Sequence, residues 1–364
     1  MYTRLLPLLR CPNCRRELEL LRLVSDATAS GEDVSEGLLH CASNHCFPIV
    51  RGVPRMLQDA LDEHWPVLRS NLPNPAPSFI RSLIQAHRQT RHRLNHDRPT
   101  RDSFSKEWDY FDLTGRTWSM ELEDRVKWFF LDPIHMSTQD LAGKTMLDAG
   151  CGNGTQSVAY TKLGLEVLAV DLSSGLEHGH GFRSMYQGAD PTKVHFIQAD
   201  LQSPPLAPAS LDLIHSAGVL HHTPDTRKTF QTLCSLLRPG STFYVWLYKY
   251  ERSVTPVVNS VRHLTTRIPT AVFEKIARLM ALPFIGFCVI CNELGIRQYS
   301  RLNRREAALA LMDIFGAPYA HYHSFDEVAD WYRAQGFQEI WSCNTGRRGF
   351  GVCGRLPSVI EETR

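Results

Sequence analysis

Short apolar runs alternate with more polar segments through the middle of the chain. Five runs rich in Val, Ile, Leu and Ala predict buried strands, over residues 146–149, 166–171, 194–201, 211–220 and 242–248. The segments between them, such as residues 155–163 and 225–237, predict helices. Strands that alternate with helices are typical of a parallel, doubly wound sheet, which binds its ligand at the carboxyl ends of the strands. The pattern therefore predicts an α/β fold.

Three glycines follow the first of these strands at alternate positions, Gly150, Gly152 and Gly154. Such a turn lets the backbone approach a ligand, and the next helix points its free N–H groups to the same place. Asp171 ends the second strand, where a carboxylate can accept hydrogen bonds from both hydroxyls of a ribose. The alternatives are a tight turn without a ligand and an aspartate that only caps a helix. The two features together favour a nucleoside site.

Residues 144–248 resemble a class I S-adenosylmethionine-dependent methyltransferase of the type that includes ubiquinone-biosynthesis enzymes. Residues 148–154 (DAGCGNG) match the first motif of that family, and residues 218–222 (GVLHH) match the motif after its fourth strand. The turn at 237–241 (LRPGS) matches the family's Leu-Lys-Pro-Gly-Gly, with Ser in the last place. A nicotinamide dehydrogenase is disfavoured, because Thr155 stands where its third glycine should be.

The resemblance implies a seven-stranded, Rossmann-like sheet. Residues 141–250 form its S-adenosylmethionine-binding core, and residues 321–364 complete the sheet with an antiparallel hairpin. In this comparison Asp171 holds the ribose, and Asp200 and Leu201 contact the adenine. The full set of expected cofactor-binding residues is Asp148, Gly150, Cys151, Gly152, Gly154, Asp171, Leu172, Asp200, Leu201, Ala217 and Gly218.

Methyl transfer from a sulfonium is an in-line displacement, so positioning is its main requirement. A general base is needed only where the acceptor must lose a proton, and His221 and His222 are the candidates because they follow the fourth strand and titrate near neutrality. A structural role in the turn before Pro224 is the alternative. The chain lacks an Asn-Pro-Pro-Tyr or Asp-Pro-Pro-Tyr sequence there, which argues against methylation of adenine or glutamine amides.

The first 58 residues carry a zinc-ribbon pattern. Cys11 and Cys14 have the two-residue spacing of a metal-binding knuckle, and Cys41 follows with His45 and Cys46 as competing fourth ligands. Four free cysteines with this spacing by coincidence are the alternative. With residues 47–54 (FPIVRGVP), the region resembles the ribbon family of a small activator of tRNA and protein methyltransferases. The match to an rRNA methyltransferase ribbon favours His45, but the fourth ligand stays open, and the zinc would be structural.

Residues 59–140 are expected to be a linker with an N-terminal helical lid. Three prolines in residues 71–78 predict a stiff connector, and residues 81–101 hold six arginines and three histidines against one acid. That basic run is either a phosphate contact or a solvated helix face. Among the aromatic residues that follow, Trp108 and Tyr110 are expected to close over the substrate, although packing into the core is the alternative.

Residues 251–320 are expected to form a helical insertion that acts as a substrate lid. Apolar residues at helical spacing fit a hydrophobic acceptor pocket, and they fit a homodimer surface as well. The substrate-binding candidates near its two ends are Tyr248, Tyr319, His321 and His323.

Composition narrows the class of protein. A formal net charge of +2 on 364 residues gives no bulk electrostatic case for nucleic acid. The N-terminus lacks the pattern of a signal peptide, so a cytoplasmic location is the default expectation. The most apolar run, residues 279–291, is shorter than the roughly 20 residues that span a bilayer, so no membrane span is expected.

The sequence therefore predicts a methyltransferase that methylates a small or medium-sized, partly apolar acceptor, most simply at oxygen or carbon. An rRNA or tRNA base methyltransferase that holds RNA through its ribbon is the alternative enzyme. A protein that binds S-adenosylmethionine and a partner without catalysis is the alternative outside enzymes. The sequence does not identify the acceptor.

Overall fold

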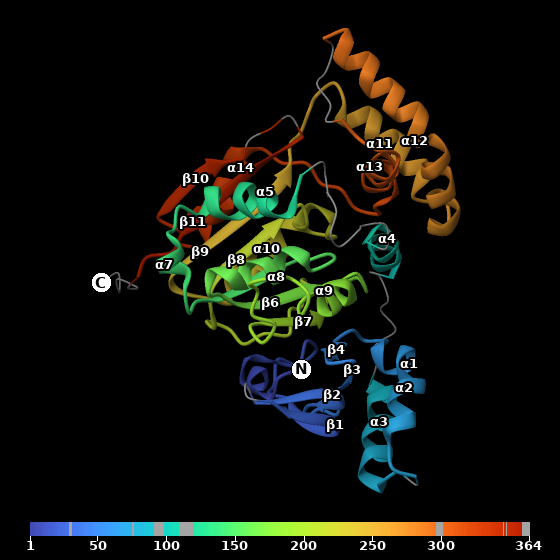
Figure 1. The fold of residues 1–364 in the computed structure, drawn as a ribbon, viewed down its shortest axis with the longest axis vertical. Coiled ribbons are helices and arrows are strands. Elements are labelled where there is room, and N and C mark those ends of the chain that lie inside the picture. Colours follow the sequence, from blue (N-terminus) through green and yellow to red (C-terminus); the bar gives the residue numbers. More distant parts are fainter. Residues whose placement is uncertain are drawn as a thin grey trace.

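A seven-stranded sheet forms the centre of the computed structural model, which describes residues 1–28, 31–74, 76–90, 98–108, 120–295, 301–344, 346 and 348–358 (Figure 1). Its order is β10-β11-β9-β8-β5-β6-β7, and only β11 runs against the others. The strands are β5 (Thr145–Ala149), β6 (Glu166–Asp171), β7 (Val194–Gln198), β8 (Leu211–Ala217), β9 (Leu237–Tyr248), β10 (Glu339–Cys343) and β11 (Gly349–Arg355). The predicted fold class, including the closing hairpin, is confirmed.

Helices cover both faces of this sheet because successive strand residues point to opposite sides. Leu147 packs in the cluster that contains Phe230 and Tyr332, whereas its neighbour Met146 packs in the cluster that contains Tyr160 and Phe182. The first face carries α10 (Thr226–Cys234) and α14 (Phe325–Ala334), and the second carries α8 (Thr155–Tyr160) and α9 (Leu176–Phe182). Short elements complete the core: α5 (Leu122–Val126), η2 (Lys127–Leu131), α6 (Asp132–Ile134), α7 (Thr138–Leu141), η3 (Thr161–Leu163) and η4 (Leu220–His222).

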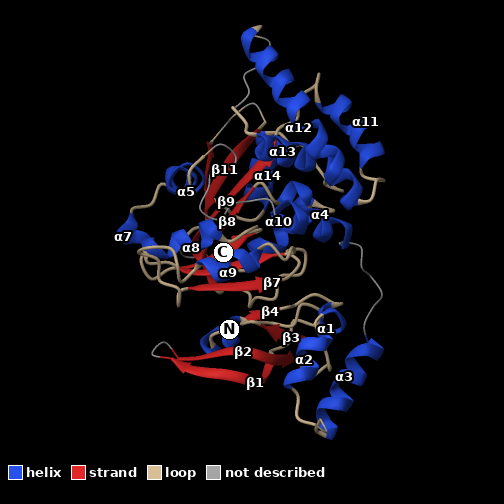
Figure 2. Ribbon diagram, turned by 45° about the vertical axis from the view of Figure 1, so that its right-hand side comes forward, coloured by secondary structure: helices blue, strands red, loops and turns tan. Residues whose placement is uncertain are grey.

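The N-terminal ribbon lies against the β7 edge of the large sheet (Figure 2). It consists of η1 (Thr3–Leu8) and an antiparallel sheet of β1 (Glu19–Thr28), β2 (Gly31–His40), β3 (Cys46–Val50) and β4 (Val53–Pro54). Arg55 and Gln198 form an isolated parallel β-bridge, and the Met56 N–H donates to the Gln198 carbonyl at 2.7 Å. Leu9 and Phe47 belong to the same apolar cluster as Leu147, so the ribbon and the core share one interior.

Four helices connect the ribbon to the core: α1 (Ala60–Glu63), α2 (Trp65–Asn71), α3 (Ser78–Thr90) and α4 (Arg98–Trp108). Leu68 and Ile84, from α2 and α3, pack with Leu38 and Cys46 of the ribbon strands. The Cys46 N–H donates to His87 Nδ1 at 2.9 Å. Helices α2 and α3 therefore pack on the ribbon.

The insertion after β9 contains α11 (Thr255–Thr265), α12 (Thr270–Glu293) and α13 (Arg304–Gly316). These helices stand at the end of the molecule opposite the ribbon (Figure 1). By length and composition alone, α12 is the one helix in the described part of the chain that could cross a membrane. The sequence analysis considered only the apolar run of residues 279–291 and expected no span. Helix α12 is longer than that run, because it also includes residues 270–278 and 292–293.

Candidate cofactor and acceptor site

The glycine turn after β5 has a backbone geometry that favours glycine. Gly150, Gly152 and Gly154 have φ angles of +84°, +58° and +71°, in the left-handed region. A Cβ on Gly150 would lie 2.3 Å from Val219, and one on Gly152 would lie 2.4 Å from the Trp108 ring. The turn therefore brings the backbone directly beneath α4 and the loop after β8.

Asp171 organises the far side of the same turn. One carboxylate oxygen accepts the Gly152 N–H at 2.7 Å, and the other accepts the Ser173 N–H at 2.7 Å and its hydroxyl at 2.6 Å. Burial raises the pKa of Asp171, although these hydrogen bonds oppose the shift. Because a carboxylate oxygen accepts more than one hydrogen bond, Asp171 keeps capacity for a further donor.

Two adjoining cavities open beside the turn. The first, of about 630 Å³, is lined by six of the expected cofactor residues, namely Gly150, Asp171, Leu172, Asp200, Leu201 and Gly218. Trp108 and His222 also line it, so one predicted substrate residue and one predicted catalytic residue meet there. We call this the nucleoside pocket.

The second cavity, of about 1160 Å³, shares Trp108, Gly150 and Gly218 with the nucleoside pocket. Its further predicted residues are Asp148, Cys151, Ala217 and Tyr248. Gly152 and Gly154 shape the turn without lining either cavity. We call the second space the acceptor cavity.

Asp148 is fixed at the floor of the acceptor cavity. It accepts the Ser157 hydroxyl at 2.6 Å and contacts His215 Nδ1 at 3.1 Å. On the other side of the ring, His215 Nε2 lies 3.1 Å from the Phe129 carbonyl oxygen. Asp148 therefore holds β5, α8 and β8 in register beneath the cavity.

Four charged side chains of the acceptor cavity were missed by the sequence analysis: Glu107, Arg125, Asp313 and Arg348. Glu107 is 3% exposed, and burial, followed by the charges of Asp313 and Asp171, raises its pKa well above the usual value. Burial likewise lowers the pKa of Arg125 to about 10, and its Nε has no hydrogen-bond partner among the described residues. No motif marks these positions, because α4, α5 and α13 reach the cavity only through tertiary packing.

Asp313 connects the insertion to the core through a polar cluster. The Tyr248 hydroxyl donates to one of its oxygens, and His222 Nε2 lies 3.3 Å from the other. His222 Nδ1 lies 2.7 Å from the Tyr319 carbonyl, and the Phe104 ring meets the His222 ring edge-on. Burial would raise the pKa of Asp313, but the bonds from His222 and Tyr248 and the His222 charge hold it below the usual value.

The remaining predicted residues lie around this cluster. His221 is fully buried and stacks on Tyr248 at 3.9 Å between ring centroids, outside the lining of both cavities, and burial lowers its pKa far below the usual value. Of the two histidines, His222 is therefore the one that lines the nucleoside pocket. Tyr319, His321 and His323 also lie outside both linings, and His323 pairs with Glu327 at 3.0 Å. Tyr110 lies outside the described residues.

The ribbon brings four potential metal ligands together. The ligand atoms of Cys11, Cys14, Cys41 and His45 all lie within 4.8 Å of one another. The Cys14 and Cys41 sulfurs are 3.6 Å apart, and His45 Nδ1 is 3.5 Å from the Cys11 sulfur. Bonds of about 2.0–2.3 Å in a tetrahedron place neighbouring ligands roughly 3.3–3.8 Å apart. The two distances given lie in that range, and all the ligand atoms of the cluster stay within 4.8 Å of one another.

Cys46, the competing fourth ligand, points away from this cluster. Its thiol faces the carbonyls of Asn44 and Leu83, at 3.7 and 3.9 Å. Of the two alternatives for the fourth ligand, the structure brings His45 into the cluster, and Cys46 lies outside it.

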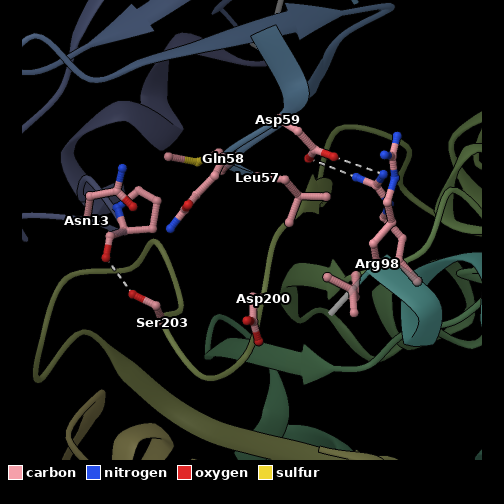
Figure 3. A pocket seen from close by; sticks show the side chains of 11 residues that line it. Asn13, Leu57, Gln58, Asp59, Arg98, Asp200 and Ser203 are labelled. Carbon is pink, nitrogen blue, oxygen red and sulfur yellow. Dashed lines mark hydrogen bonds and ion pairs between the residues drawn. The ribbon is translucent and has the colours of Figure 1, made fainter. Parts of the chain in front are cut away.

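A third pocket lies between the ribbon and the core (Figure 3). Asn13 and Gln58 face Asp200 and Ser203 across it. The Ser203 hydroxyl donates to the carbonyl of Pro12, inside the Cys11–Cys14 knuckle, at 2.5 Å. Because Asp200 also lines the nucleoside pocket, the Cys11–Cys14 knuckle is one hydrogen bond away from the loop that borders this pocket.

Comparison with known proteins agrees with this geometry. Residues 147–245 match the family model of a methyltransferase domain. A ubiquinone biosynthesis O-methyltransferase of Xanthomonas euvesicatoria is 32% identical over 120 residues, which are 32% of this chain and 49% of that protein. A ubiquinone biosynthesis O-methyltransferase of Albidiferax ferrireducens is 23% identical over 209 residues, which are 54% of this chain and 81% of that protein. The chain thus spans about half the length of the first relative.

Solved structures give lower similarity. Phosphoethanolamine N-methyltransferase 2 of Haemonchus contortus, in complex with S-adenosyl-L-methionine, aligns with a TM-score of 0.45 and 14% identity, over 72% of this chain and 59% of that one. Magnesium protoporphyrin IX methyltransferase of Synechocystis aligns with a TM-score of 0.41 and 15% identity, over 70% of this chain and 97% of that one.

The sheet order, the glycine turn and the family match over residues 147–245 agree in a methyltransferase domain of the class that the motifs predicted. In sequence the chain is similar to ubiquinone biosynthesis O-methyltransferases.

Proposed function

We propose that the protein transfers a methyl group from S-adenosylmethionine to a small or medium-sized, partly apolar acceptor, with oxygen as the favoured atom. The observation that carries this proposal is the junction of the nucleoside pocket and the acceptor cavity at Gly150 and Gly218. A cofactor whose adenosine fills the first space presents its sulfonium at the mouth of the second. The aromatic wall of the acceptor cavity, Phe104, Trp108, Phe129, Trp246 and Tyr248, suits a planar apolar acceptor.

Cofactor binding is assigned to residues of the turn and the strand ends. Asp171 would hold the ribose hydroxyls, and Leu172 with Asp200 would bound the adenine. Arg125 would pair with the cofactor's carboxylate, because it is a buried guanidinium that lines the cavity near Asn153 and Gln156. The bound cofactor supplies the methyl group, and these residues supply its orientation.

Glu107 is the candidate proton acceptor. Its buried carboxyl lines the acceptor cavity, and its raised pKa brings it nearer the operating pH, as a general base requires. In the transfer a carbon–sulfur bond breaks, an oxygen–carbon bond forms, and the proton of the acceptor hydroxyl passes to Glu107. His222, held between Asp313 and the Tyr319 carbonyl, would position the acceptor.

A structural zinc ion in the ribbon is part of the proposal. Cys11, Cys14, Cys41 and His45 would hold it, because their spacing fits tetrahedral coordination. The ion would stabilise a module with little core of its own.

The contacts of the basic run give RNA methylation less support. Arg88 pairs with Asp62 at 3.1 Å, and Arg101 pairs with Asp59 at 3.0 Å. His87 is buried against the ribbon. Two of the four described arginines of this run are therefore engaged in internal ion pairs, and an acceptor screen that includes RNA decides between the two substrates.

The assignment of the cofactor is tested with Asp171→Ala. Loss of two hydrogen bonds to a charged group predicts a fall in S-adenosylmethionine affinity of about 100-fold or more by calorimetry. Asp212→Ala is a matched control, because this carboxylate pairs with Arg238 and lines neither cavity. Unchanged affinity in Asp171→Ala, with the fold intact by circular dichroism, would contradict the assignment.

The acceptor is identified by incubating the enzyme with methyl-labelled cofactor and a panel of phenols, catechols, amines and total RNA. Label transfer to a phenolic hydroxyl supports the proposal. Transfer to RNA alone would replace it with the alternative enzyme. Tight cofactor binding without transfer to any member of the panel or to a cell extract would indicate a binding protein.

A further inference from the structure

Helix α12 exposes an apolar face that no described residue covers. The residues that turn outward on it include Leu279, Leu282 and Ile290, which are 74%, 58% and 58% exposed, and Leu294, directly after the helix, is 66% exposed. Residues 279–292 contain no charged side chain. Scattered exposed leucines are ordinary, but a run of this length on one helix marks an interaction surface.

The opposite face of α12 is occupied by the protein itself. The buried residues Phe273, Ala277, Ala281, Cys288 and Cys291 recur at helical spacing and define one side of the helix. Ala277 and Ala281 pack in clusters with residues of α13. A helix that crossed a bilayer would have to leave these contacts. The geometry therefore favours a helix that lies along a surface, with its outer side free to bind.

Basic side chains outnumber acidic ones among the exposed residues of the insertion. Among the described residues from 251 to 305, the exposed acidic side chain is Glu293, whereas the exposed basic ones are Arg252, Arg267, Lys275, Arg278, Arg301, Arg304 and Arg305. Lys275 and Arg278 lie on α12 itself, before the uncharged stretch begins, and Arg278 pairs with Glu274 at 2.8 Å. Exposed Val257 and Leu264 add apolar area on the neighbouring α11.

We propose that the outer face of α12, which we call the α12 patch, docks on the surface of a membrane that contains anionic lipid. Apolar side chains would enter the boundary between headgroups and acyl chains, and the surrounding Lys and Arg residues would meet the lipid phosphates. Figures 1 and 2 show that the C-terminal half of α12 projects from the end of the molecule opposite the ribbon, where a flat surface can reach it.

A second copy of the chain fits the charge pattern less well. A two-fold interface places the same patch against itself, so the basic side chains around one α12 would face those around the other. An anionic surface instead neutralises them. This inference goes beyond the proposed function, because docking does not require methyl transfer.

The test is co-sedimentation of the full-length protein with vesicles. We expect binding to phosphatidylcholine vesicles that contain phosphatidylglycerol, weaker binding at high salt, and little binding to pure phosphatidylcholine. Leu279→Glu with Ile290→Glu should weaken binding by about tenfold or more. Met185→Glu is the matched control, because Met185 is 67% exposed and lies outside the insertion.

The charge contribution is tested separately with Lys275→Glu, against Arg69→Glu as a control at an exposed basic residue of α2. Lys275→Glu should weaken binding to the anionic vesicles by about fivefold or more, and Arg69→Glu should not. Equal binding of the double glutamate variant and the parent would overturn the proposal. Concentration-dependent dimerisation that Leu279→Glu abolishes, without vesicle binding, would assign the α12 patch to a second copy instead.

Discussion

The ribbon and the helical insertion are two additions to the same sheet, and they are joined to it in different ways. The ribbon shares a continuous apolar interior with the sheet, in which Leu9 and Phe47 are fully buried. The insertion contacts the core mainly through α13, keeps small clusters of its own, and leaves the α12 patch exposed. A module that shares its interior serves the fold, whereas one that leaves an apolar face exposed is available for a partner.

The largest effect that this comparison predicts is the loss of the ribbon's metal. Zinc sites of this type contribute on the order of 10 kcal/mol to folding, so chelation should unfold β1 to β4 while the large sheet remains folded. Hydrogen exchange of the ribbon amides measures this, and elemental analysis of the untreated protein should find about one zinc.

Two neighbouring cysteines provide the matched pair for this experiment. Cys41→Ala removes a member of the cluster and should lose zinc, whereas Cys46→Ala should keep it, because Cys46 faces Leu83 instead. Zinc retained by Cys41→Ala, or lost by Cys46→Ala, would show that the ligand set is wrong.

The ribbon and the insertion should also differ in how much a leucine contributes to stability, an effect smaller than the loss of zinc. Leu9→Ala, at a fully buried site between ribbon and core, should lower the free energy of unfolding by about 2–5 kcal/mol. Leu279→Ala, at a site 74% exposed, should change it by less than about 0.5 kcal/mol. Denaturant titration measures both, and equal effects would remove the distinction between the two modules.

The next prediction concerns the cavity that the insertion helps to enclose. Glu107→Gln should lower kcat by about 100-fold or more, because the amide cannot accept a proton. In the parent enzyme kcat/KM should rise with pH as Glu107 ionises, above the usual carboxylate pKa because burial raises that of Glu107. In Glu107→Gln this rise of kcat/KM with pH should be absent, and the affinity for the cofactor should be unchanged.

Asp313→Asn is the companion variant from the insertion. It leaves one accepting oxygen where the carboxylate has two, so the side chain can no longer accept from both Tyr248 and His222, and the KM of the acceptor should rise. If kcat/KM still rises with pH in Glu107→Gln but not in Asp313→Asn, Asp313 of the insertion is the general base instead of Glu107.

The sequence was informative wherever chemistry demands a fixed spacing. The glycines need positive φ angles, Asp171 must end its strand, and two thiols of one knuckle need two residues between them, so each left a local signature. Glu107, Arg125 and Asp313 have no such constraint, since they reach the cavity from separate helices. His221 and His222 are adjacent in sequence, yet only packing decides that one stacks on Tyr248 and the other lines the nucleoside pocket.

The smallest predicted effect tests whether the ribbon communicates with the cofactor at all. Ser203→Ala removes the hydrogen bond to the Pro12 carbonyl in the metal knuckle, beside the loop that carries Asp200. One neutral hydrogen bond contributes about 0.5–1.5 kcal/mol, so S-adenosylmethionine affinity should fall by roughly two- to tenfold. Ser235→Ala, which loses a bond to Thr232 away from the ribbon, should leave the affinity unchanged. Equal affinities in the two variants would mean that the ribbon stabilises the fold without reaching the cofactor, and that the shared interior is its whole contribution.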